Sequence, residues 1–91
     1  MKCIKISIVT KSDEKFLSNF VKKKAENFDL EGIAKKMGKS QYDILVCGDD
    51  EDLDLFLDEL YRGSKDFKPD FLEVESFLKD RDFRGVFRVI E

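Results

Sequence analysis

Side chains of the usual catalytic kinds are scarce in this sequence of 91 residues. It contains no histidine, the residue that most often serves as a general base near neutral pH and as a metal ligand. Four consecutive carboxylates occupy residues 49–52, but they lack the alternating ligand spacing and the glycine of a calcium-binding loop. They directly precede an apolar helical pattern, so capping of a helix and interaction with its dipole explain them better. We therefore expect no metal and no cofactor.

The two cysteines, Cys3 and Cys47, fit neither a zinc-binding pattern nor a redox C-x-x-C pair. Each lies in a strand-like segment, and the two strands are expected to be antiparallel neighbours. A cross-strand disulfide would require the two Cα atoms to lie within about 7 Å. Cytosolic proteins keep their thiols reduced, which favours two half-buried thiols and leaves the disulfide as the alternative.

The charge balance argues against a nucleic-acid partner. The net charge is −3, whereas nucleic-acid-binding proteins usually concentrate a basic excess on one face. The basic cluster Lys22-Lys23-Lys24 is followed by Glu26, which is typical of a solvated helix face. No stretch approaches the roughly 18 apolar residues of a membrane helix, and the first residues alternate instead of forming a signal peptide. We expect a cytoplasmic protein without membrane contact.

The apolar pattern predicts strands and helices in a fixed order. Period-two alternation or β-branched content indicates strands at residues 2–10, 30–36, 41–47, 71–76 and 86–90. Helical spacing indicates amphipathic helices at residues 16–28, with Ser12 as the N-cap, and 53–61, ending at Arg62 and Gly63. This order predicts an α+β, ferredoxin-like β-α-β-β-α-β sandwich with an additional short C-terminal strand. The sheet is expected to be antiparallel, with both helices on one face, and residues 1–91 to form a single domain.

Two segments resemble the acylphosphatase family. Residues 30–36 are similar to the family's L-x-G-x-V/A-x-N segment, and residues 42–50 are similar to its V-E-V-x-A-x-G-x-x stretch, at the family's spacing and without a gap. The helix at residues 53–61 with Gly63, and the final strand, also fit. The resemblance implies the ferredoxin-like fold and a metal-independent hydrolase of the carboxyl-phosphate bond in small acyl phosphates.

The resemblance also assigns site positions. The family's signature G-R-V-Q-G-V-G-F-R holds a phosphate with backbone N–H groups and a final arginine, while an asparagine of the second strand orients the attacking water. Counting back from Gly32 without gaps places this signature on residues 10–18, where none of its glycines is kept. The arginine position is Ser18 and the asparagine position is Lys36. The candidate substrate-binding residues are Lys11, Ser12 and Lys15.

These replacements argue against catalysis. Ser18 has neither the charge nor the bidentate fork of arginine. Lys36 carries donors only, so it cannot accept a hydrogen bond from the water that it should orient. Asp13 and Glu14 place negative charges where a phosphate would lie.

The sequence therefore favours an acylphosphatase-like protein that is catalytically impaired and acts as a binding or interaction module for a small anion or acyl phosphate. The alternative is an active acylphosphatase in which Lys36, assisted by Lys11 or Lys15, serves as a relocated phosphate anchor. A small-ligand regulatory or RNA-binding domain has less support, because the central strands place no aromatic residue on their open face. The oligomeric state is left open.

Overall fold

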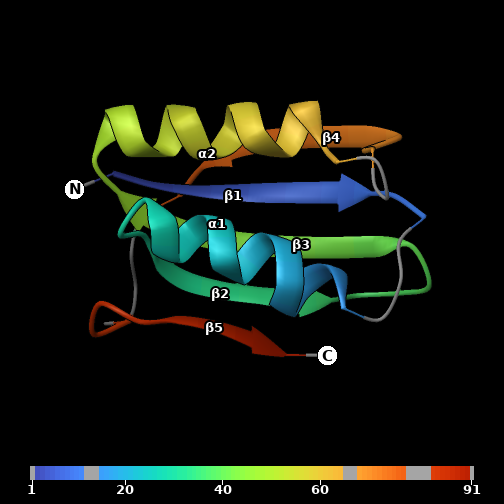
Figure 1. Ribbon diagram of the computed structural model, residues 1–91, viewed down its shortest axis with the longest axis horizontal. Coiled ribbons are helices and arrows are strands. Elements are labelled where there is room, and N and C mark those ends of the chain that lie inside the picture. Colours follow the sequence, from blue (N-terminus) through green and yellow to red (C-terminus); the bar gives the residue numbers. More distant parts are fainter. Residues whose placement is uncertain (1, 12–14, 65–67, 78–82, 91) are drawn as a thin grey trace.

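The computed structural model describes residues 2–11, 15–64, 68–77 and 83–90. Its centre is a five-stranded sheet with the strand order β4-β1-β3-β2-β5 (Figure 1). The strands are β1 (Lys2–Val9), β2 (Glu31–Lys36), β3 (Gln41–Gly48), β4 (Phe71–Ser76) and β5 (Phe87–Ile90). Paired strands run antiparallel except β2 and β5, which are parallel. The expected ferredoxin-like order is confirmed, and the additional C-terminal strand makes the sheet mixed instead of purely antiparallel.

The helices lie together on one face of the sheet, in front of it in Figure 1. The first helical segment consists of the π-helix η1 (Phe16–Val21), which continues as α1 (Lys22–Asn27), and the second is α2 (Asp50–Arg62). Hydrogen bonds of a π-helix join residues five apart, which turns both Phe16 and Val21 toward the core. The predicted first helix is thus present, but its first half is wound more widely than the sequence pattern suggested. None of the helices described is long and apolar enough to cross a membrane.

The hydrophobic core fills the space between the helices and the sheet. Strand alternation directs Ile4, Ile6 and Ile8 toward the helices, and the register places them opposite Val46, Ile44 and Tyr42 of β3. The helices bury their own apolar side chains against this layer: Leu17, Val21, Ala25, Leu53, Phe56 and Leu60. The predicted alternation of both central strands is therefore confirmed.

The second helix begins and ends close to the predicted residues. Asp49 occupies the N-cap position with an extended backbone, and three acidic residues lie in the first turn, near the positive end of the helix dipole. The Asp49 side chain makes no capping hydrogen bond, so the expected side-chain cap is wrong and the acidic run acts through its charge. Arg62 lies in the last turn, and Gly63 ends the helix at φ 69°, a conformation that favours glycine.

Cys3 and Cys47 form a disulfide on the open face, the face of the sheet opposite the helices. They are direct cross-strand partners of β1 and β3, with their Cα atoms 4.1 Å apart. The expectation of two reduced thiols is wrong, because the register brings these side chains to the same point of the same face. Disulfides persist mainly in oxidising compartments, so the cytoplasmic location stays a prediction that this bond does not support.

Candidate functional site

Three segments meet at one end of the molecule, where β1 ends, η1 begins and β2 turns into β3. The amide of Thr10 donates a hydrogen bond to the carbonyl oxygen of Ser40 at 2.8 Å, which ties the end of β1 to the β2–β3 turn. The ring of Phe16 packs edge-on against that of Tyr42, with centroids 4.9 Å apart, which ties the start of η1 to the start of β3. The segment that the resemblance identifies as the phosphate loop therefore leaves and re-enters the fold at this end.

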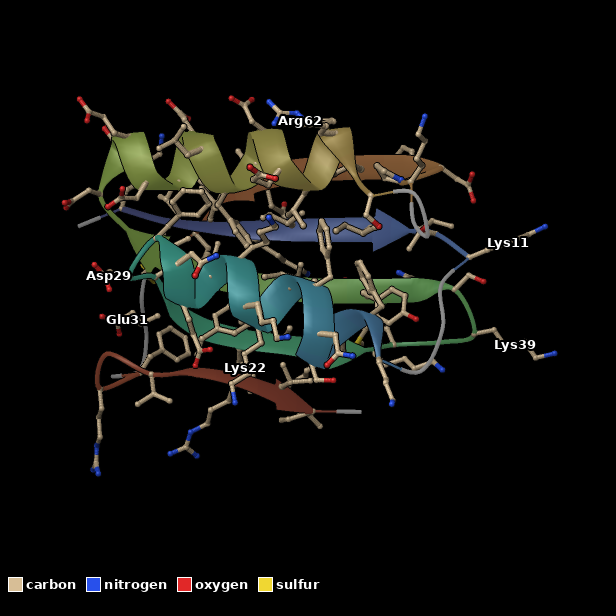
Figure 2. All side chains as sticks on the ribbon, in the orientation of Figure 1. Lys11, Lys22, Asp29, Glu31, Lys39 and Arg62 are labelled. Atoms are coloured by element: carbon tan, nitrogen blue, oxygen red, sulfur yellow. A yellow bond between two sulfur atoms is a disulfide. The ribbon has the colours of Figure 1, made fainter. Side chains whose placement is uncertain are left out.

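Exposed lysines gather at this end, which we call the lysine end: Lys11, Lys15, Lys36 and Lys39. Figure 2 shows Lys11 and Lys39 projecting from it, while Asp29 and Glu31 lie at the opposite end. Among the described residues, Lys11, Lys36 and Lys39 take part in no ion pair. Their positive charges are thus available to an anion from solution.

Lys36, the last residue of β2, has a position fixed by the sheet. It pairs with Tyr42 of β3, and Tyr42 faces the helices. Because successive residues of a strand point to opposite faces, Lys36 lies on the helix side and Lys35 on the open face. Lys36 is therefore next to the beginning of η1, whose Phe16 contacts Tyr42.

Ser18 lies in η1 and is exposed, between the buried Leu17 and exposed Asn19. π-Helical turns are rare and are frequently found at functional sites, so this segment fits a site whose geometry is not that of a plain helix. The Ser18 hydroxyl contributes no charge, and the positive potential of this end rests on the lysines. Ser12 lies outside the described residues, as do Asp13 and Glu14. The N-cap of η1 is Lys15, which makes no side-chain capping hydrogen bond, so the prediction of Ser12 as the N-cap is wrong.

Thr10, the first position of the assigned loop, is fully buried. Its hydroxyl donates a hydrogen bond of 2.8 Å to the carbonyl oxygen of Lys68, and the amide of Asp70 donates to the carbonyl oxygen of Val9, also at 2.8 Å. The side chain at the first loop position therefore fastens β1 to the segment before β4. Sequence reasoning missed this role, because the two partners are far apart in the chain.

Lys39 lies between the two segments that carry the family resemblance, so sequence reasoning did not single it out. The amide of Met37 donates to the carbonyl oxygen of Gln41 at 2.8 Å, and this tight turn returns the chain beside Lys36. The signal was present in the sequence: a lysine at the tip of a short turn follows a lysine at the end of a strand. Two lysines so close in sequence around one turn lie at the same end of the sheet.

The other end of the sheet carries the opposite charge. A hollow of about 640 Å³ there is lined by Lys2, Gly48 and the acidic run of residues 49–52. Negative potential at one end and positive potential at the other favour approach of an anion to the lysine end. The geometry thus supports anion binding at the lysine end.

The fold and the site together define an α+β, ferredoxin-like protein. Its cationic end lies where the first strand leads into the first helical segment. The family model for acylphosphatase matches residues 16–88, and the chain belongs to the acylphosphatase family. The match begins at Phe16, past residues 10–15 of the loop.

Solved structures of similar proteins support the fold. An acylphosphatase from Coxiella burnetii has a TM-score of 0.84 and 24% identity, covering 97% of this chain and 90% of that chain. An acylphosphatase from Bacillus subtilis has a TM-score of 0.77 and 22% identity, with 99% and 97% covered. HypF from T. kodakarensis has a TM-score of 0.78 and 23% identity, and the match covers all of this chain but 12% of that one. A comparison with curated protein sequences finds no match.

Two glycines that carry the family resemblance support the scaffold. Gly32 has φ +151°, and a Cβ placed on it would collide with the backbone oxygen of Leu45. A Cβ on Gly48 would collide with the side chain of Leu30. Gly32 is therefore required by the close approach of the β3 backbone whether or not the site is active, whereas the contact at Gly48 is with the end of a side chain.

Proposed function

We propose that this member of the acylphosphatase family binds a small anion or acyl phosphate at the lysine end without hydrolysing it, and so acts as a binding module. The observation that carries the proposal is the position of Lys36. Lys36 pairs with Tyr42 on the helix side of β2, and the family resemblance assigns to this position the asparagine that orients water, which supports the proposal.

An ammonium group at this position changes the chemistry available. Asparagine has both an acceptor and donors, so it can accept a hydrogen bond from water and direct a lone pair toward phosphorus. Lysine donates only, and it therefore holds the oxygen of a water or a phosphate without orienting a nucleophile. Binding of the anion is kept or strengthened, while positioning of the attacking water is lost.

The rest of the site changes in the same direction. Ser18 replaces the arginine that would grip phosphate with a bidentate fork. Thr10 replaces the first loop glycine, and its side chain is committed to the Lys68 carbonyl. Removal of one electrostatic donor typically lowers the rate by about 10²–10³, so loss of two groups and a rebuilt loop is expected to abolish useful turnover.

The lysines of the lysine end support the proposed binding of an anion. Each cation within about 4 Å of an anion contributes on the order of 1–4 kcal/mol before desolvation, with the lower value at an exposed site. Lys11, Lys36 and Lys39 take part in no ion pair among the described residues, and their three charges favour a dianion such as phosphate over a monoanion. A location in the cytoplasm, where small phosphate esters are abundant, remains part of this proposal.

A second candidate, an active acylphosphatase with lysine as the relocated phosphate anchor, is favoured by the same clustering of lysines. Hydrolysis of benzoyl phosphate separates the two. The binding-module proposal expects the uncatalysed rate in the presence of the protein, and the same rate for the Lys36→Ala variant. Turnover that falls in Lys36→Ala but not in Lys2→Ala, a charge change at the opposite end, would establish the second candidate.

A combined Ser18→Arg, Lys36→Asn variant adds a control for the loop. Because residues 10–18 also lack the family's glycines, restoring the two side chains alone is expected to leave the protein inactive. Activity in this variant would show that the loop can still hold a phosphate productively and that the two side chains account for the whole loss.

A further inference from the structure

The open face of the sheet contains a hollow that is separate from the lysine end. Its volume is about 180 Å³, smaller than the roughly 300 Å³ of the smallest typical drug-sized pockets. The lining side chains come from the three central strands and the turn after β2: Lys5, Ile33, Lys35, Met37, Asp43 and Leu45. Strand alternation directs all of these strand residues away from the helices.

The floor of this hollow is apolar. Ile33 and Leu45 are cross-strand partners at the centre of the sheet, and Ile33 is only 8% exposed although none of the helices described covers this face. Met37 stands at the rim with 56% of its surface exposed. An apolar floor with a flexible methionine at its rim can bind a short alkyl chain.

The basic side chains around the floor differ in whether they form ion pairs. The Nζ atom of Lys5 lies 3.9 Å from Oδ2 of Asp43 and 3.8 Å from Oε1 of Glu75, so the charge of Lys5 is already shared between two carboxylates. Lys35 is the register partner of Asp43, yet it forms no ion pair with any described residue. On the β5 side, Arg88 is exposed and pairs in register with Ile33. Excess positive charge therefore lies on the β2–β5 side of an apolar floor.

We propose that this open-face hollow binds a small amphipathic carboxylate, with its hydrocarbon part on Ile33 and Leu45 and its carboxylate at Lys35. Lys35 and Lys36 point to opposite faces of β2, so this site and the lysine end are reached from different sides of the sheet. The inference does not depend on the proposed function, because it uses neither Lys36 nor the loop.

Titrations followed by ¹H–¹⁵N NMR test this assignment, with hexanoate, hexanol and inorganic phosphate as probes. Hexanoate is expected to shift the amides of Lys5, Ile33, Lys35 and Leu45 in a saturable way. Hexanol, which lacks the charge, is expected to bind more weakly, and phosphate, which lacks the hydrocarbon, is expected to leave these amides unchanged. Shifts by phosphate near Lys11 and Lys36 report on the lysine end independently.

Two variants with exposed positions provide the matched control. Lys35→Gln is expected to weaken hexanoate binding by about threefold to fivefold, as for loss of one exposed ion pair, while Lys23→Gln, an exposed lysine of α1 on the other side of the sheet, leaves it unchanged. Equal affinity in Lys35→Gln and the unaltered protein, equal binding of hexanol and hexanoate, or shifts confined to the lysine end would each overturn the proposal.

Discussion

Lys36 and Tyr42 are cross-strand partners, and the ring of Tyr42 in turn contacts Phe16 at the start of η1. The backbone position of Lys36 and the face to which it points are therefore set by the sheet register and not by the loop. In the proposed function, a lysine on the helix side of the sheet attracts a phosphate and lacks the acceptor that would orient water.

Removal of this charge is expected to weaken phosphate binding. Lys36→Ala should raise the dissociation constant of inorganic phosphate by about fivefold, corresponding to about 1 kcal/mol for one charge at an exposed site. Lys2→Ala removes an equal charge at the acidic end and should leave the constant unchanged. Isothermal titration at low ionic strength measures both, and equal affinity for the two variants would contradict the assignment of the site.

The conformation of Gly32 predicts a large loss of stability on substitution. Gly32→Ala introduces a Cβ that collides with the backbone oxygen of Leu45 at φ +151°, and we expect the free energy of unfolding to fall by about 3 kcal/mol or more. Gly38→Ala is the matched control, since a Cβ there meets no atom within 4 Å. Urea unfolding of both variants provides the comparison, and similar stabilities would refute the close approach of β2 and β3.

The disulfide is expected to stabilise the protein against unfolding. It closes a loop with a sequence separation of 44, for which the chain-entropy relation gives about 4 kcal/mol. Reduction should therefore lower the unfolding free energy by an amount of this order in urea titrations. A Cys3→Ala, Cys47→Ala variant should be insensitive to the reductant, and a shift of its midpoint on reduction would assign the effect to something other than this bond.

The hydroxyl of Thr10 is expected to stabilise the start of the loop. Thr10→Val keeps the shape but removes the donor to the Lys68 carbonyl, which should cost about 1–2 kcal/mol of unfolding free energy. Thr10→Ser keeps the donor and should retain most of that contribution. If the two variants were equally stable in urea, the hydrogen bond would have no net value.

The strands and helices could be predicted wherever the polarity of a residue indicates whether its side chain is buried or exposed. Alternation of Ile4, Ile6 and Ile8 marks a half-buried strand, and the burial pattern of β1 agrees with it. The π-helical winding of η1 was not foreseen, because the group Phe16, Leu17, Phe20 and Val21 also fits the apolar face of an ordinary amphipathic helix. The capping hydrogen bond expected from the acidic run is not made by the Asp49 side chain, because residue type favours a cap without fixing the direction of the side chain.

The candidate site was predictable only in part. Lys11, Lys15 and Lys36 were identified through the family resemblance, and the structure brings their segments to one end. Lys39 could have been inferred from the short turn that follows Lys36. The buried hydrogen bond of Thr10 depends on how distant segments meet, which no local pattern encodes. The pairing of Cys3 with Cys47 likewise depends on exact register, since a slip of one residue would send one side chain to the opposite face.

The central claim is that the lysine end binds an acyl phosphate but does not hydrolyse it, and a single-turnover assay measures this most directly. Protein in excess over benzoyl phosphate, at concentrations above the measured phosphate dissociation constant, ensures that most of the compound is bound. The account predicts that the bound compound decays at the rate measured in buffer alone. A decay rate that rises and saturates with protein concentration, and that falls to the buffer rate in Lys36→Ala, would contradict it.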